Sequence, residues 1–232
     1  MSLSAELKSC LLSKGASLVG FADLKDIPAA YRNNKKYGIS IAVALEPSIV
    51  HGIAEGPTQE YYAAYKSLNE QLDNLVLFTG DFLKGMGYEA VMKTTTEVVI
   101  DDHAIGTVLP HKTIATRAGL GWIGKCALLV TENFGSAIRI SSVLTDAPLE
   151  VGKAINESRC GNCHNCVEAC PGKAPMGINW ELGKPREEFF NAFECRKAAR
   201  EKAALVGIDG TLCGKCIEIC PWTQRYLRRK PT

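Results

Sequence analysis

The sequence predicts an α+β fold: a mixed α/β N-terminal domain followed by a cysteine-rich domain. In residues 1–150, segments with helical apolar spacing alternate with short apolar segments rich in β-branched residues. Two of the short segments, 127–131 and 137–144, are joined by a tight Gly-containing turn, which predicts an antiparallel hairpin and argues against a doubly wound sheet. Beyond residue 150 Cys, Gly and Pro dominate, so we place the domains at 1–150 and 151–232.

Each element of the N-terminal domain has its own sequence signal. Apolar residues recur at helical spacing in two stretches, and in the longer one Pro57 suits the first turn while Gly80 marks a site for a kink. Short β-branched runs predict buried strands. The predicted order is a helix at 3–14, strands at 17–22 and 39–45, a helix at 57–86, a strand at 88–96, a short helix at 110–118 and the hairpin at 127–144.

Bulk composition excludes several classes of protein. The 232 residues carry a formal net charge of +2 and are 46% hydrophobic, as expected of a globular chain that buries a core. No run of about 18 apolar residues predicts a membrane span, and the N-terminus lacks the basic region and apolar core of a signal peptide. These features predict a cytoplasmic protein without membrane association.

Eight of the ten cysteines lie within residues 160–220, which in a cytosolic chain indicates metal binding rather than disulfides. The first group has the spacing C-x2-C-x2-C-x3-C-P, the run of bacterial ferredoxins whose fourth Cys ligates the other [4Fe–4S] cluster. This first group is Cys160, Cys163, Cys166 and Cys170, followed by Pro171. The second group is Cys213, Cys216 and Cys220, and the upstream Cys195 can supply its missing thiolate.

Crossed ligation of this kind divides the eight cysteines into two sets of four. The first ligand set is Cys160, Cys163, Cys166 and Cys220, and the second ligand set is Cys170, Cys195, Cys213 and Cys216. The alternative is a pair of structural zinc sites, but zinc typically uses two separated C-x2-C pairs without a third Cys and a following x3-C-P. The sequence therefore predicts a bacterial-type 2[4Fe–4S] ferredoxin-like domain that moves low-potential electrons.

Two cysteines stand outside these sets. Cys10 lies on the apolar side of the first predicted helix, and Cys126 follows a Gly-rich segment. Free Cys is commonly buried, so packing is the favoured interpretation of both, and redox chemistry stays open for Cys126.

The Gly-rich segment 117–125, R-A-G-L-G-W-I-G-K, has three glycines in six residues, which permits positive φ and close backbone approach. Such a loop could contact phosphate or a flat cofactor, or it could form a tight packing turn. It is not G-x-G-x-x-G after a strand, which excludes a dinucleotide fingerprint. Its candidate cofactor-binding residues are Arg117, Gly119, Gly121, Trp122, Gly124 and Lys125.

Together with its downstream neighbours, this segment resembles epoxyqueuosine reductase. The resemblance rests on 117–125, on L-L-V-T at 128–131, G-S at 135–136 and L-T-D at 144–146, and on the order of the cysteine groups up to Cys220-Pro221-Trp222. It implies a cobalamin-reductase or nitroreductase-like N-terminal fold that holds cobalamin beside two [4Fe–4S] clusters. It also implies reduction of an epoxide on a tRNA nucleoside, with the cofactors carrying the chemistry. This chain resembles a short member without the C-terminal helical region of longer ones.

The resemblance also implies a catalytic Asp upstream of Arg117, at an offset that falls on Ile105 in this chain. Only an insertion would align Asp101 or Asp102, the candidate catalytic residues, with that position. The alternative interpretation of Asp101-Asp102-His103 is a solvated turn.

Three functions follow from these interpretations, of which the third, a redox- or metal-responsive binding module, rests only on the unassigned Cys126. The first is an iron–sulfur reductase of the epoxyqueuosine-reductase type, supplied with electrons by a ferredoxin- or flavodoxin-type donor protein. The second is a non-catalytic ferredoxin-like electron-transfer protein that docks on a partner enzyme. tRNA is the less favoured partner because a near-neutral chain lacks a broad basic footprint, although the basic tail at 225–230 could touch a phosphate backbone. The sequence does not specify an oligomeric state.

Overall fold

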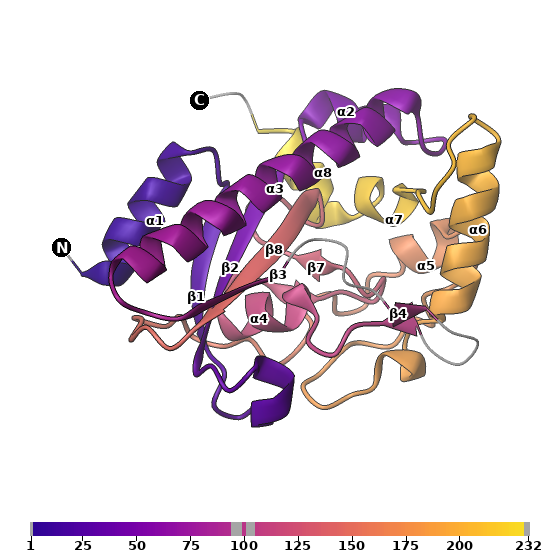
Figure 1. Ribbon diagram of the computed structural model, residues 1–232. Coiled ribbons are helices and arrows are strands. Elements are labelled where there is room, and N and C mark those ends of the chain that lie inside the picture. The colour runs from indigo at the N-terminus through magenta and orange to yellow at the C-terminus, as the bar shows by residue number, and fades with distance from the viewer. Residues whose placement is uncertain (1, 94–98, 101–104, 230–232) are drawn as a thin grey trace. The chain divides into compact units, whose positions relative to one another are not determined.

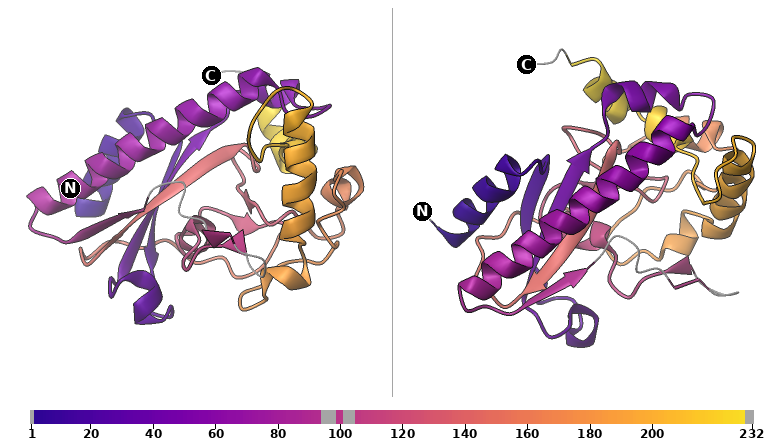
Figure 2. Two further views of the ribbon diagram at one scale, coloured as in Figure 1. Left: turned by 45° about the vertical axis from the view of Figure 1, so that its right-hand side comes forward. Right: turned by 45° about the horizontal axis from the view of Figure 1, so that its top comes forward.

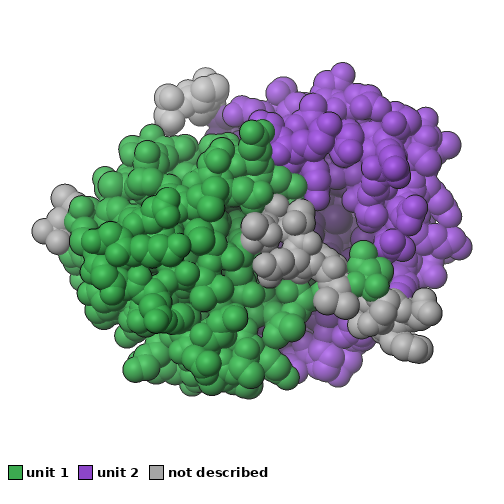
Figure 3. Space-filling model, viewed as in Figure 1, with its two compact units in different colours: residues 1–43, 68–121, 139–155 green, residues 44–67, 122–138, 156–232 purple. Residues whose placement is uncertain are grey.

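A computed structural model describes residues 2–93, 99–100 and 105–229 of the chain. The chain divides into two compact units, and each unit combines stretches that are far apart in sequence (Figure 3). Unit 1 comprises Met1–Val43, Leu68–Gly121 and Arg139–Ile155, and unit 2 comprises Ala44–Ser67, Trp122–Ile138 and Asn156–Thr232. Segments from before residue 150 therefore group with the cysteine-rich part, which a boundary drawn from composition alone does not anticipate.

Figure 1 shows the elements in chain order. They are α1 (Leu3–Ser13), β1 (Leu18–Asp23), η1 (Ala29–Arg32), β2 (Tyr37–Ala44), α2 (Pro47–Gly52), α3 (Gln59–Gly85), β3 (Ala90–Lys93), β4 (Val99–Ile100), β5 (Ile105–Gly106), α4 (His111–Arg117), β6 (Trp122–Ile123), β7 (Leu129–Val130), β8 (Ile138–Thr145), α5 (Asn165–Ala169), η2 (Arg186–Glu188), α6 (Ala192–Ala204), α7 (Lys215–Glu218) and α8 (Pro221–Leu227).

Unit 1 is built on a four-stranded sheet with the strand order β1-β2-β8-β3. Strand β1 pairs antiparallel with β2, with Leu18 opposite Ala42, and β3 pairs antiparallel with β8, with Ala90 opposite Thr145. Because side chains alternate along each strand, the two faces of this sheet carry two separate apolar layers.

Helices cover both faces of the sheet. One face carries Ile39, Ile41 and Val143, which are fully buried against Leu11 of α1 and Leu72 of α3. The views in Figures 1 and 2 show α3 running across the strands. The opposite face packs against α4 through a second cluster, which consists of Ala22, Leu24, Leu109, Ile114, Ala118 and Leu144. Burial on both faces explains why the strands read as continuous apolar runs rather than alternating ones.

Most predicted elements of unit 1 are confirmed. The helices expected at 3–14, 57–86 and 110–118 correspond to α1, α3 and α4, and the first two strands correspond to β1 and β2. The strand expected at 88–96 corresponds to β3, and its last residues lie outside the described part of the chain.

Gly80, the site expected for a kink, does not divide the long helix. The helix α3 runs without interruption through this position. A Cβ on Gly80 would lie 2.6 Å from the sulfur of Met92, so the glycine lets strand β3 approach the helix closely.

The predicted hairpin between 127–131 and 137–144 is wrong. Both strands form, but β7 pairs with β6 and β8 pairs with β3, and the bridge from Thr131 to Gly135 lies within the turn between the two segments. The physical reason is burial: β8 is apolar on both faces, with Val143 and Leu144 each fully buried in a different cluster, so it belongs inside a sheet. The antiparallel character of the fold is confirmed through other strand pairs.

The α-helices of unit 2 that follow the first cysteine are short, with 4 to 7 residues, except for α6, which has 13. Cys166 lies on α5, Cys195 on α6 and Cys216 on α7, and Cys220 is the N-cap residue of α8. None of the helices in the described part of the chain has the length and apolar character needed to cross a bilayer.

We expect Ile41→Ala to lower the free energy of unfolding by about 2–5 kcal/mol, because it removes a fully buried side chain from the core beneath α1 and α3. Leu77→Ala is the matched control: it lies on α3 but is 52% exposed, so its effect should stay within about 0.5 kcal/mol. Urea unfolding followed by circular dichroism under anaerobic conditions measures both. Equal effects of the two substitutions would contradict this account of the core.

Candidate metal centre

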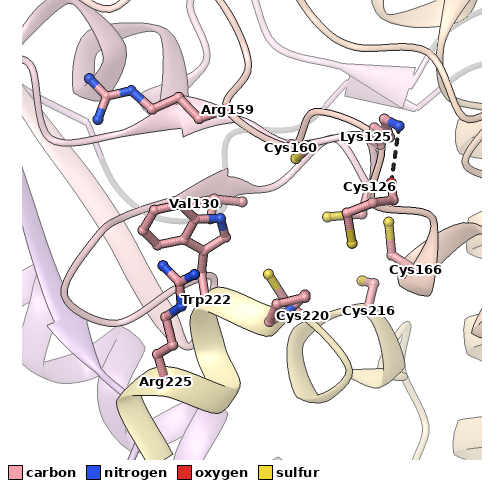
Figure 4. A pocket seen from close by; sticks show the side chains of 13 residues that line it. Lys125, Cys126, Val130, Arg159, Cys160, Cys166, Cys216, Cys220, Trp222 and Arg225 are labelled. Atoms are coloured by element: carbon pink, nitrogen blue, oxygen red, sulfur yellow. Dashed lines mark hydrogen bonds between the residues drawn. The ribbon is translucent and has the colours of Figure 1, made fainter.

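Thiols from separate segments of unit 2 line one cavity of about 260 Å³ (Figure 4). The cysteines around it are Cys126, Cys160, Cys163, Cys166, Cys216 and Cys220. In the close view the labelled sulfur atoms point into a common space. The structure thus brings all four residues of the first ligand set together.

Backbone geometry fixes these cysteines. The N–H of Cys163 donates to the carbonyl of Cys160 at 3.1 Å, closing the first turn of the loop before α5. Gly214 precedes α7 with a φ of 84°, a left-handed conformation that glycine adopts without strain. Cys220 caps α8, where burial raises the pKa of its thiol and hydrogen bonds from the backbone N–H groups of Thr223 and Trp222 lower it.

The stretch 44–67 supports the second cysteine loop from within unit 2. A Cβ on Gly214 would lie 2.5 Å from Cδ1 of Ile53, so the loop packs directly on this side chain. The ammonium of Lys215 donates to the carbonyl of Ala54 at 2.5 Å. The hydroxyl of Tyr226 on α8 donates to the carbonyl of Leu45 at 2.9 Å. These contacts explain why a stretch far from the cysteines in sequence belongs to the same unit.

A two-stranded ribbon brings the end of the Gly-rich segment to the cavity. Strands β6 and β7 pair with Trp122 opposite Val130, and the N–H of Gly124 donates to the carbonyl of Leu128 at 2.9 Å. The turn at its tip holds Ala127 at a φ of 58°. Lys125 and Cys126 therefore project from the tip into the lining of the cavity.

Lys125 is a buried cation beside the thiols. Lys125 is only 2% exposed, and its ammonium donates to the carbonyl of Cys163 at 3.0 Å. A buried ammonium is costly without a compensating negative charge. Thiolates or an anionic cluster in the cavity would supply that charge. Interaction with Cys126 and burial raise the pKa of Cys166, and the ammonium of Lys125 opposes this shift.

The second ligand set is gathered less completely. Burial raises the pKa of Cys195 to about 11, and the nearby thiols of Cys170 and Cys213 add to this shift. These three thiols are therefore close enough to interact. Their expected companion, Cys216, lines the first cavity and interacts with Cys126. The assignment of Cys216 to the second set stays a prediction.

Two tryptophans join the ribbon to α8. Trp122 is fully buried and meets Trp222 edge to face, with ring centroids 4.9 Å apart. The guanidinium of Arg159 lies 5.5 Å from the ring of Trp122, and that of Arg225 lies 4.5 Å from the ring of Trp222. Cation–π and aromatic contacts of this kind hold the two sides of the cavity wall together.

The turn after β7 packs against the first residues of α8. Gly135 has a φ of 57°, and a Cβ there would lie 2.2 Å from the backbone nitrogen of Thr223. The N–H of Ser136 donates to the hydroxyl of Thr223 at 3.1 Å, and Phe134 meets Tyr226 edge to face. This contact fixes α8, and therefore Cys220, against the ribbon.

The candidate cofactor-binding segment divides between the two units. In unit 1 the guanidinium of Arg117 donates to the carbonyl of Ile155 at 2.7 Å. A Cβ on Gly119 would lie 2.5 Å from the carbonyl oxygen of Lys153, so this glycine permits close packing. Gly121 is buried at the end of a stretch of unit 1, whereas Gly124 and Lys125 line the cysteine cavity of unit 2 and Trp122 is buried in unit 2. Cofactor binding by this segment stays a prediction.

The donor set fits an iron–sulfur cluster. Cysteine thiolates are the usual ligands of such clusters. Among the residues that the structure describes, no three or more His, Cys, Asp or Glu side chains are gathered closely enough to hold a single metal ion. The thiols of the first ligand set line one cavity of about 260 Å³.

Sequence reasoning left two contributors to the site unassigned. For Cys126 the sequence favours packing and leaves redox chemistry open, and its position among other cysteines becomes visible only when the ribbon folds. The stretch 44–67 carries no cysteine and no motif, so no sequence signal connects it to the site. The candidate catalytic residues Asp101 and Asp102 lie outside the described residues.

Comparison with known proteins agrees with this geometry. Residues 159–223 match the 4Fe-4S double cluster binding domain family. An epoxyqueuosine reductase from Pseudomonas aeruginosa is 34% identical over 115 residues, which cover 49% of this chain and 32% of that protein. The chain thus matches only about a third of that relative's length. The similarity to epoxyqueuosine reductases expected from the sequence is confirmed.

Solved structures share the fold. An epoxyqueuosine reductase with an epoxyqueuosine-modified tRNA-Tyr stem loop has a TM-score of 0.61 at 22% identity, covering 96% of this chain and 65% of that one. A reductive dehalogenase whose structure suggests a mechanism for B12-dependent dehalogenation has a TM-score of 0.69 at 18% identity, covering 94% of this chain and 31% of that one. At these identities the likeness establishes a common fold.

We expect Gly135→Ala to lower the free energy of unfolding by about 2–4 kcal/mol, because it adds overpacking against the backbone of Thr223 to the strain of a positive φ. Iron retention should fall as well, because the substitution displaces α8 and Cys220. Gly183→Ala is the control, with a φ of 90° and no atom within 4 Å of the added Cβ. Anaerobic unfolding and iron analysis measure both, and wild-type iron in a stable Gly135→Ala protein would contradict this role of the turn.

Proposed function

We propose that this epoxyqueuosine reductase-like chain is an iron–sulfur oxidoreductase whose two [4Fe–4S] clusters pass low-potential electrons to a corrinoid or a substrate held by its N-terminal segments. The observation that carries the proposal is the cavity of unit 2, where Cys160, Cys163, Cys166 and Cys220 converge although 60 positions separate the first from the last. The match of residues 159–223 to a double-cluster family supports it independently.

The chain's own residues have defined tasks in this function. Thiolates of the two ligand sets hold the iron, and a bound cluster supplies one-electron transfer. The backbone N–H groups of Trp222 and Thr223, which donate to Cys220, and the ammonium of Lys125 stabilise negative charge at the first cluster. Burial of the thiols restricts water, which tunes the potential and limits side reactions.

A corrinoid is the favoured electron acceptor. The dehalogenase neighbour shares the fold and is connected with B12-dependent chemistry, and the epoxyqueuosine reductase neighbour was solved with a modified tRNA stem loop. We therefore infer an electrophilic substrate, in the first instance an epoxide on a tRNA nucleoside. Arg117 and the glycines that follow it are the candidate residues of the corrinoid-binding segment, and Asp101 and Asp102 are candidates for a proton-donating residue.

The ligand assignment predicts a specific loss of iron in one variant. Anaerobic reconstitution of the wild-type chain should give about eight iron and eight sulfide per chain, and Cys195→Ser should lower both to about half. The reason is that Cys195 supplies a thiolate to the second cluster only. Colorimetric iron and sulfide analysis, with the visible absorbance of the clusters, measures the change.

Cys10→Ser is the matched control, because Cys10 is half-buried on α1 in unit 1 and outside both ligand sets. It should retain wild-type iron. Unchanged iron in Cys195→Ser, or a wild-type chain that binds zinc in place of iron, would overturn the assignment.

Corrinoid binding is tested separately on the reconstituted chain. After incubation with cobalamin and gel filtration under anaerobic conditions, we expect corrinoid absorbance to elute with the protein at about one per chain. Intact clusters without retained corrinoid would remove the corrinoid from the proposal and favour the electron-transfer protein that docks on a partner enzyme.

A further inference from the structure

Cys126 belongs to neither ligand set, yet it lies among the ligands. It is 5% exposed and lines the same cavity as five cysteines of the two sets (Figure 4). A cysteine kept only for packing would be expected among apolar side chains, whereas this one lies among sulfur atoms.

The contacts of Cys126 connect the two ligand sets. Its thiol lines the same cavity as the thiols of Cys166, from the first set, and Cys216, from the second set, and interaction with Cys126 raises the pKa of Cys166. Once both sets are ligated, all of their sulfur atoms are acceptors, and Cys126 is a neighbouring free cysteine whose S–H could donate to them. A cysteine S–H is a weak donor that can serve one acceptor at a time.

The ribbon holds this thiol in place. The N–H of Ala127 donates to the carbonyl of Gly124 at 2.8 Å, which closes the tip around Lys125 and Cys126. A Cβ on Gly124 would lie 3.6 Å from the sulfur atoms of both Cys126 and Cys160, so the glycine leaves room for the two sulfurs to approach. The anchoring of Lys125 on the carbonyl of Cys163 restricts the tip further.

The geometry points to Cys126 as a positioning residue of the clusters: an uncoordinated ninth thiol that donates its S–H to a ligating sulfur of Cys166 or Cys216 and raises the reduction potential of that cluster. This inference rests on the proposed function, since it requires both clusters. Reduction adds negative charge to a cluster, and hydrogen bonds to its sulfur atoms stabilise the more negative state.

The test compares donor-free and donor-bearing replacements in the full, anaerobically reconstituted chain. Cys126→Ala should keep wild-type iron and sulfide but shift one cluster to a more negative midpoint potential. At the wild-type midpoint its reduced-to-oxidised ratio should fall about tenfold, which corresponds to about 59 mV for one electron. Cys126→Ser, which keeps an O–H donor, should titrate close to wild type, and redox titration followed by electron paramagnetic resonance measures each cluster.

The possible outcomes separate the inference from the proposed function. Full iron with an unshifted potential in Cys126→Ala overturns this inference but leaves the proposed function intact. Loss of half the iron in both the alanine and serine variants also overturns it, because Cys126 would then be a cluster ligand. Cys126→Val, which also lacks a donor, replaces the alanine variant if the smaller side chain prevents assembly. A wild-type chain that takes up no iron overturns the proposed function itself.

Discussion

Charge compensation around buried sulfur is the constraint on which unit 2 depends. Cysteines from α5, α7, the N-cap of α8 and the tip of the β6–β7 ribbon line one cavity. Negative charge on their buried sulfur atoms is stable only if hydrogen-bond donors or positive charges compensate it. The ammonium of Lys125 and the backbone N–H groups of Trp222 and Thr223 beside Cys220 provide this compensation. The tight contacts at Gly135 and Gly214, with the paired tryptophans, keep these donors in position.

Unit 1 is organised by a different interaction, the burial of a sheet on both faces. Its central strands carry apolar residues toward α1 and α3 on one side and toward α4 on the other. The Gly-rich segment begins at the end of α4, where the guanidinium of Arg117 donates to the carbonyl of Ile155 and Gly119 packs closely against the backbone of Lys153. The beginning of the segment is therefore anchored in one unit and its end lines the cysteine cavity of the other.

Local signals identified the parts of this protein whose structure depends on near neighbours. The helical periodicity of Leu68, Leu72 and Leu75 located α3, and the β-branched runs located β1 and β2. The hairpin prediction failed because strand pairing is a non-local choice. Residues 137–144 had an adjacent partner in sequence, but burial on two faces placed β8 between β2 and β3 instead.

The sequence by itself determined the chemistry of the site: the spacing of the cysteines at 160–170 and 213–220 specifies thiolate cages for iron, because loop lengths between ligands are a property of the local chain. Only the tertiary structure decided what surrounds those cages. Burial of Lys125, the approach of Cys126 to Cys166 and Cys216, and the support from 44–67 all depend on contacts between segments distant in sequence. Such contacts follow from how apolar surfaces pack together, and no short motif records them.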